Sequence, residues 1–401
     1  MTMPPSKRFV PPPGPSAANT DNTWSLRVAR VSGIPIRLHF TFLLLLIWFA
    51  VSDLNMGGAG LIISMLGLFL CIALHELGHS ITAQRLGYCV RDITLYPIGG
   101  VAAIEGNMRP RHELYIALAG PAVNVVIAGL VTVTLTLLHR PFPFGSPFRV
   151  AAQAMGHDPL QFLLAANLTL VVFNMIPAFP MDGGRVLRAV LGLRLGKARA
   201  TRIAATVGQF VAVLMALWGL GVFSPFGVRG GLGQVIIALF VFFAAGQEAQ
   251  EASYEEARTI ADDTPVEAAM VRDFQTLVPG DSLHRASEVL LATHQQDFPV
   301  VLGGEVAGVL SRAALLRAFA REGGDAYVAG AMTRDVLFAA PDDPLEDFMF
   351  RSDGVQRAPV LVRDKAGKLV GMLTMENIME FLTIRRIDIA HDSARPAGTG
   401  F

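Results

Sequence analysis

The sequence predicts a polytopic α-helical membrane protein of about six spans with a membrane-associated β-hairpin, followed by a soluble α+β module. Three observations support this fold class. The chain of 401 residues is 52% hydrophobic and only 16% charged, whereas a soluble domain is nearer a quarter charged. Its first part contains six apolar segments, and an internal repeat follows residue 250.

The N-terminal residues 1–33 begin "MTMPPSKRFVPPPGPS" and show no hydrophobic periodicity. Such a proline-rich, polar composition predicts a disordered tail. A cleaved signal peptide is not expected, because no apolar core follows the first charges until about residue 39. The apolar segments that follow are each near the length of a membrane span: about 39–52, 60–84, 114–138, 160–177, 203–223 and 232–247.

The basic residues predict the orientation of these spans. With a cytoplasmic N-terminus, fifteen Lys and Arg residues fall on inside segments and three, Arg140, Arg149 and Arg229, fall outside. Cytoplasmic loops carry the excess of basic residues, so both termini are expected in the cytoplasm. The balance of 33 basic and 33 acidic residues gives no indication of a nucleic-acid partner.

The repeat pairs "AAMVRDFQTLVPGDSL" (268–283) with "GAMTRDVLFAAPDDPL" (330–345). Each copy is expected to form a helix, two short strands and a closing amphipathic helix. A duplicated unit in this order resembles a tandem pair of CBS domains. The predicted organisation is a tail, a membrane-embedded domain, a linker, two repeats and a second tail: 1–33, 34–250, 251–264, 265–326, 327–388 and 389–401.

The second apolar segment contains "CIALHELGHSITA". His75 and His79 are four residues apart and share one helix face, with Glu76 about a quarter-turn away. Two imidazoles at this spacing can hold one zinc ion, while a glutamate accepts a proton from the attacking water. The alternative is a set of polar residues lining a water-filled channel. Cys71, one turn before His75, is interpreted as a buried cysteine rather than a ligand.

A catalytic zinc ion needs a third protein ligand. Asp182 stands in "FNMIPAFPMDGGRVLRA", where prolines end one helix and Gly183-Gly184 permit an abrupt turn. Local sequence leaves two roles open for Asp182, a metal ligand or the N-cap of the next helix. The predicted topology brings Asp182 and the histidines to similar depth near the cytoplasmic face, which favours the ligand.

Together, the His-Glu-x-x-His motif in a span and "NMIPAFPMDGG" a hundred residues later resemble the site-2 protease family of intramembrane zinc metalloproteases. With CBS repeats at its C-terminus, the chain resembles the prokaryotic branch that carries such domains. The resemblance implies one zinc ion per chain held by His75, His79 and Asp182, with Glu76 as general base. It also implies a plasma-membrane protease whose substrate is a single-span membrane protein.

The same resemblance implies further roles around the site. Asn174 would hold substrate or the oxyanion, and Asn124 of "AGPAVN" matches another family motif. A helix–helix hydrogen bond is the alternative role for Asn124. The segment "DITLYPIGGVAAIEG" (92–106) would form a membrane-dipping β-hairpin. Its edge strand could hold an unwound substrate by β-addition.

In the second repeat, Thr374 and Asn377 stand where a strand ends and a helix begins, an arrangement that suits ribose and phosphate. In the first copy Ser311 remains, but Ala314 replaces the polar partner. The repeats are therefore expected to bind an adenine nucleotide in one cleft, or to serve only for docking and homodimerisation.

The leading hypothesis is an intramembrane zinc protease in the lipid bilayer, regulated through its CBS pair. A CBS-gated transporter for ions or metals could use the same polar intramembrane residues. That alternative gives no reason for a glutamate placed as a proton acceptor. A third hypothesis is an inactive relative that binds client proteins without cleaving them, but every residue of the motifs is present.

Overall fold

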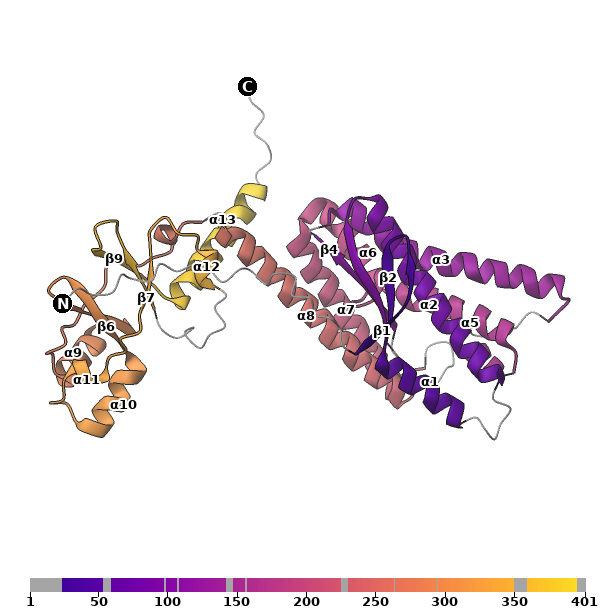
Figure 1. The fold of residues 1–401 in the computed structure, drawn as a ribbon, viewed down its shortest axis with the longest axis horizontal. Coiled ribbons are helices and arrows are strands. Elements are labelled where there is room, and N and C mark those ends of the chain that lie inside the picture. Colours follow the sequence, from indigo (N-terminus) through magenta and orange to yellow (C-terminus); the bar gives the residue numbers. More distant parts are fainter. Residues whose placement is uncertain are drawn as a thin grey trace, which may run out of the picture. The chain divides into compact units, whose positions relative to one another are not determined.

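The structure is a computed structural model that describes residues 24–52, 59–96, 99–106, 108–141, 147–155, 157–224, 230–262, 264–293, 295–349 and 359–394. The chain divides into two compact units between Ser253 and Tyr254 (Figure 1). The first unit combines a sheet with mostly apolar helices. The second unit contains the sequence repeat.

A four-stranded sheet in the order β1-β2-β3-β4 forms part of the first unit. Its strands are β1 (Ser25–Val31), β2 (Ile34–His39), β3 (Cys89–Tyr96) and β4 (Gly99–Glu105). β2 and β3 are parallel and the other pairs are antiparallel. The predicted hairpin within 92–106 thus corresponds to β3 and β4, and β4 is an edge strand.

The N-terminal tail was predicted to be disordered through residue 33, and this is wrong for its last residues. Residues 25–31 form β1, which pairs with β2 after a turn at Ser32 and Gly33. Two residues with positive φ make this turn, and Gly33 adopts that conformation without strain. The part of the tail before residue 24 lies outside the described residues.

Eight helices are described in or entering the first unit. They are α1 (Phe40–Ser52), α2 (Ala59–Arg85), α3 (Pro110–Leu137), α4 (Pro147–Ala154), α5 (Pro159–Asn174), α6 (Asp182–Leu195), α7 (Lys197–Gly219) and α8 (Leu232–Asp262). Among the described residues, four helices are long and apolar enough to cross a membrane: α2, α3, α7 and α8. These helices indicate an integral membrane protein.

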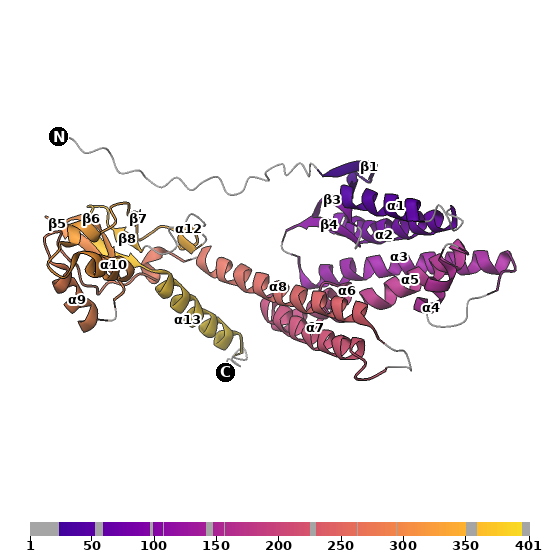
Figure 2. The same cartoon turned by 90° about the horizontal axis from the view of Figure 1, so that it is seen from below.

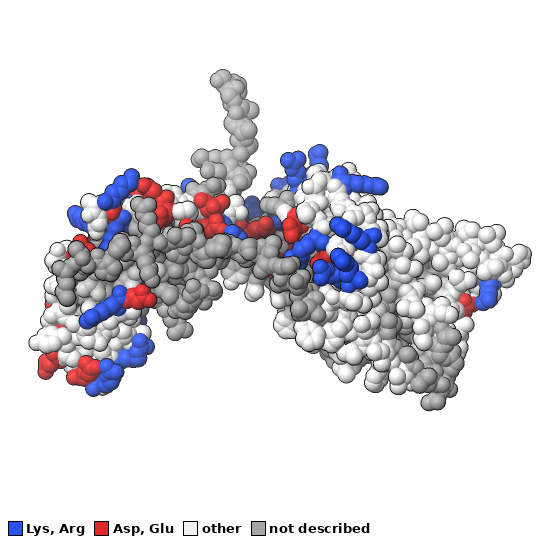
Figure 3. Space-filling view, viewed as in Figure 1, with Lys and Arg blue, Asp and Glu red and all other residues white. Residues whose placement is uncertain are grey.

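Six spans were predicted, but only four helices among the described residues have the length and composition of a span. The two remaining candidates are short, since α5 has 16 residues and α1 has 13, against about 20 for a typical span. Large apolar side chains such as Leu130, Phe240 and Phe243 are exposed on the helices. On the face seen in Figure 3, Lys and Arg gather at one end of this unit, and most of its remaining surface is uncharged.

Close helix packing sets the positions of α2, α3, α5 and α6. α3 packs against each of the other three (Figure 2). Gly78 on α2 allows the closest approach, because a Cβ there would lie 2.9 Å from the carbonyl oxygen of Ala119 on α3. Small residues let helix backbones approach in this way within membranes. The sheet packs on the end of α2 through a core that includes Ile34, Ile93 and Ala83.

The second unit contains two copies of a helix, two strands and a closing helix, and the second copy has an additional strand before these elements. The first copy holds α9 (Leu283–Ala292), β5 (Asp297–Leu302), β6 (Glu305–Ser311) and α10 (Arg312–Glu322). The second holds β7 (Leu337–Ala339), α12 (Glu346–Met349), β8 (Val360–Arg363), β9 (Leu369–Leu373) and α13 (Met375–Ala394). Short helices η2 (Val266–Ala268) and α11 (Val328–Ala331) lie at the start of the two copies.

The copies bury their strands against each other, since Val309 of β6 shares a core with Leu361 of β8 and Met372 of β9. The helix α13 continues to Ala394, beyond the predicted boundary at residue 388. The predicted tail from 389 therefore begins inside a helix, and its residues from 395 lie outside the described part of the chain.

Candidate metal centre

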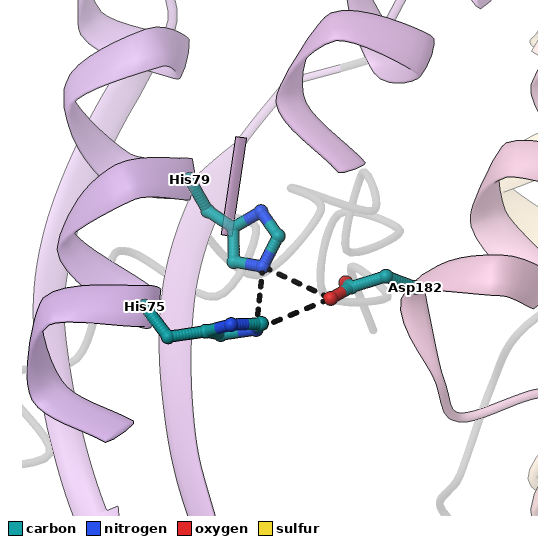
Figure 4. Close-up of side chains that lie close together, drawn as sticks. All are labelled: His75, His79 and Asp182. Carbon is teal, nitrogen blue, oxygen red and sulfur yellow. Dashed lines mark hydrogen bonds and ion pairs between the residues drawn. The ribbon is translucent and has the colours of Figure 1, made fainter. Parts of the chain in front are cut away.

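Three side chains from two helices converge inside the first unit (Figure 4). His75 and His79 project from consecutive turns of α2, and Asp182 is the first residue of α6. The N-cap of α6 is Met181, and it makes no side-chain capping bond. Asp182 therefore does not take the N-cap position that local sequence left open, and its carboxylate points toward the imidazoles.

The ligand atoms form a nearly equilateral triangle. Nε2 of His75 and Nε2 of His79 are 3.1 Å apart, and each lies 3.2 Å from Oδ2 of Asp182. All three residues are buried. Atoms bound to one tetrahedral zinc ion at about 2.1 Å lie about 3.4 Å from one another. The triangle is therefore the size that a shared zinc ion requires, with a fourth position left for water or substrate.

The protonation of His79 explains why a cation belongs there. Its Nδ1 lies 2.6 Å from the carbonyl oxygen of Ile116 on α3. A carbonyl oxygen only accepts, so Nδ1 carries the proton and Nε2 of the neutral ring is a lone-pair acceptor. Oδ2 of Asp182 is buried with no hydrogen-bond donor among the described residues. The lone pairs of His79 Nε2 and Asp182 Oδ2 therefore face each other across 3.2 Å, an arrangement that a bound cation stabilises.

Glycine leaves the space for this cluster. A Cβ on Gly120 of α3 would lie 2.2 Å from Nε2 of His79 and 2.7 Å from Nε2 of His75. On α6, a Cβ on Gly183 would lie 2.2 Å from the carbonyl oxygen of Ile176. The first turn of α6 thus packs directly on the preceding loop, which sets the position of Asp182.

Glu76 lies beside the edge strand. A Cβ on Gly100 of β4 would be 2.4 Å from Cγ of Glu76, so the strand backbone passes directly against this side chain. Gly100 pairs with Leu95 in β3, and the other edge of β4 has no strand partner among the described residues. A half-buried carboxylate therefore lies next to a free strand edge.

The comparison with known proteins decides the family. The profile described as peptidase family M50 matches residues 63–148 and 139–217. The zinc metalloprotease MJ0392 of Methanocaldococcus jannaschii is 30% identical over 362 residues, which cover 90% of this chain and 97% of that protein. The chain belongs to peptidase family M50. It is a member of the zinc metalloproteases that form this family, and it carries two CBS domains, matched at residues 261–321 and 328–384.

The chain is also similar to two further proteins. The protein Rip3 of Mycobacterium tuberculosis is 30% identical over 249 residues, covering 58% of this chain and 60% of Rip3. A solved structure titled site-2 protease from Methanocaldococcus jannaschii is 35% identical and covers 56% of this chain and 95% of its own, with a TM-score of 0.41.

The two asparagines predicted near the M50 site take different positions. Asn174 is the last residue of α5 and is half-buried. Asn124 is fully buried one turn beyond Gly120. Neither amide atom of Asn124 has a hydrogen-bond partner within the described residues. The helix–helix hydrogen bond considered for Asn124 is therefore not found among those residues.

In the second CBS copy, Thr374 and Asn377 contact each other. The Thr374 hydroxyl donates to Oδ1 of Asn377 and accepts from the Asn377 backbone N–H at 3.2 Å. In the first copy, Ser311 accepts from the Ala314 backbone N–H at 3.2 Å. Both copies thus begin their closing helix with a hydroxyl side chain accepting from the backbone.

Sequence reasoning missed three contributors to the M50 site. The Ile116 carbonyl and the space at Gly120 both depend on how α3 packs against α2, which a linear pattern does not reveal. Arg185 lies one turn after Asp182, with Nη1 4.0 Å from Oδ1 of that carboxylate. A spacing of three residues after a predicted ligand is the signal that could have identified Arg185.

Proposed function

We propose that this M50 protein is an intramembrane zinc endopeptidase that cleaves single-span membrane proteins within or near the bilayer. One zinc ion per chain would be held by His75, His79 and Asp182. The observation that carries the proposal is the buried triangle of three possible ligand atoms with edges of 3.1 to 3.2 Å. When bound there, zinc supplies a Lewis acid that polarises a carbonyl group and lowers the pKa of water.

The protein groups then have separate tasks. Glu76 accepts the proton of the attacking water and returns it to the leaving amine. The Ile116 carbonyl keeps His79 in the tautomer that offers Nε2. Asn124 and Asn174 are proposed to hold the substrate or its developing oxyanion with their side-chain amides. The unpartnered amide of Asn124 supports this assignment.

The free edge of β4 is proposed to bind the substrate backbone. A transmembrane helix has all its backbone groups paired, so it must unwind before a peptide bond can be attacked. An edge strand replaces the lost hydrogen bonds by adding the unwound segment to the sheet. Because Gly100 lies against Glu76, a peptide along β4 would pass next to the general base.

The test uses purified protein with a library of single-span substrates, with and without a zinc chelator. Cleavage should require zinc. Glu76→Gln should retain zinc and lose cleavage by at least about a hundredfold, because glutamine is isosteric but is a poor base. Asp182→Ala should bind zinc much more weakly. Near-wild-type cleavage by Glu76→Gln would exclude the mechanism, and metal-dependent ion flux without cleavage would favour a transporter.

We also propose that the CBS pair binds an adenine nucleotide and regulates cleavage, with Thr374 and Asn377 as contacts. The placement of both side chains at the start of α13 supports this, because a helix N-terminus attracts phosphate. Calorimetry of the whole protein with ATP, AMP and adenosine tests it. Absence of heat at millimolar ligand would leave a docking or homodimerisation role.

The proposed setting is the plasma membrane of a prokaryote, with six spans and both termini in the cytoplasm. The fifteen-to-three distribution of basic residues supports this orientation. It requires the short helices α1 and α5 to serve as spans together with the four long ones.

A further inference from the structure

Three charged side chains meet in the first unit outside the metal ligands. Nε of Arg188 donates to Oε1 of Glu113 at 2.8 Å, and Nη2 lies 2.6 Å from the same oxygen. Nη1 of Arg188 donates to Oε1 of Glu248. The side chains of Glu113, Arg188 and Glu248 are 5%, 12% and 33% exposed, so the central pair is buried. We call this group the Arg188 bridge.

The Arg188 bridge joins three helices of the first unit, α3, α6 and α8. Glu113 lies on α3 three residues before Ile116, whose carbonyl oxygen holds His79. Arg188 lies on α6, the helix that begins with Asp182. Glu248 lies on α8. The bridge therefore ties the helix carrying one predicted zinc ligand to the helix that orients another.

Arg188 also supports the loop before Asp182. Its guanidinium carbon lies 5.0 Å from the ring centroid of the buried Phe179, within the range of a cation–π contact. A Cβ on Gly184 would lie 2.7 Å from the Phe179 backbone nitrogen. The Phe179 loop is thus held between the first turn of α6 and the Arg188 side chain. A planar guanidinium can make all three contacts at once, whereas a lysine ammonium cannot.

We propose that Arg188 is a positioning residue for the metal centre, setting the location of Asp182 relative to His79 through the Arg188 bridge. This inference rests on the zinc site proposed above. It assigns Arg188 no contact with substrate or metal. It gives a function to a buried ion pair whose desolvation is costly and whose net contribution to stability is small.

The experiment measures the rate of zinc release to a chelator from the purified whole protein. Arg188→Gln should release zinc at least about tenfold faster than wild type, and Arg188→Lys should be intermediate. Leu135→Ala is the matched control, because it opens a cavity at a fully buried position of α3 away from the bridge. If zinc release in Arg188→Gln is no faster than in Leu135→Ala at equal thermal stability, the inference is wrong.

A double-mutant comparison tests whether Arg188 acts through Asp182. In an Asp182→Ala background, Arg188→Gln should increase the rate of zinc release less than twofold, because the ligand that Arg188 positions is gone. Multiplicative effects would assign Arg188 a general structural role and overturn the proposal. The visible spectrum of cobalt-substituted protein should change in Arg188→Gln and remain wild-type in Leu135→Ala. Wild-type protein that binds no zinc would instead refute the proposed function itself.

Discussion

Position 120 is a glycine, and the absence of a Cβ there allows the imidazoles of His75 and His79 to converge. The space that a Cβ would occupy there is already filled by Nε2 of His79 and Nε2 of His75, at 2.2 and 2.7 Å. Contacts below 3.0 Å force one partner to move, and here both partners are predicted zinc ligands. Gly120 is therefore part of the candidate metal centre although it offers no ligand atom.

We expect Gly120→Ala to lose most of its bound zinc while the helices remain folded. Gly129→Ala is the control, because it lies on the same helix and a Cβ there has open space around it. Metal analysis of both purified variants checks the expectation, and Gly129→Ala should retain zinc. Full zinc occupancy in Gly120→Ala would show that the histidines reach the metal in another arrangement.

The candidate ligands could be proposed from sequence because their chemistry is carried by residue type and spacing. His75 and His79 need only a helix to share a face, and Asp182 needs only a break at the right depth. The Ile116 carbonyl, the space at Gly120 and the Arg188 bridge could not be proposed in this way. They depend on contacts between helices that are far apart in sequence, such as 2.8 Å from Arg188 to Glu113.

At the scale of elements, β4 and α2 meet at Gly100 and Glu76. We expect Gly100→Ala to reduce cleavage strongly with zinc retained, because a new Cβ at 2.4 Å from Cγ of Glu76 displaces the side chain that we propose as general base. Val101→Ala is the control on the same strand, since Val101 is exposed. Cleavage rate and metal content together check this. Unchanged turnover in Gly100→Ala would show that the contact between β4 and Glu76 does not matter for cleavage.

Some helices and strands could be predicted from the sequence and others could not. The long apolar helices and the hairpin were evident because their hydrophobic patterns are strong. The strand β1 was missed because proline-rich sequence precedes it and its side chains from Leu26 to Arg30 are all exposed. Its pairing with β2, rather than burial, fixes its conformation. Such a strand leaves little hydrophobic signal in the sequence.

At the scale of the whole molecule, the orientation in the membrane remains a prediction. Single cysteines introduced at Arg194 in the last turn of α6 and Arg199 in the first turn of α7, both exposed, should resist an impermeant thiol reagent added outside cells. They should react after the membrane is opened. Efficient labelling from outside would place the metal centre near the opposite face. The native Cys71 and Cys89 would be replaced first.

The stability of the unit that contains the CBS repeats should also depend on pH. Burial raises the pKa of Asp297 to about 6, above its unfolded value of about 3.9. The folded state therefore holds a proton that the unfolded state releases, and stability falls as pH rises from about 4 to about 6. Asp297→Asn should be more stable than wild type at pH 7.5 by about 1 to 2 kcal/mol, after allowing for partial exposure.

The two proteins should differ little at pH 4. Thermal unfolding of the whole protein at both pH values checks this, with the exposed Asp273→Asn as control. A constant difference between wild type and Asp297→Asn at both pH values would exclude titration of Asp297 as the cause.

The proposed binding of substrate along β4 implies a length scale for substrate selection. β4 has seven residues, so a guest chain paired along it leaves helical form over about two turns. Unpaired backbone groups in hydrocarbon cost several kcal/mol each, and the number of residues that can unwind together is limited by the strand that receives them. Selection then depends on how readily two turns of a helix melt, more than on the identity of the residues cleaved. Substrates with Gly or Pro in those turns should be cleaved faster than all-Leu versions, and equal rates would show that unwinding is not limiting.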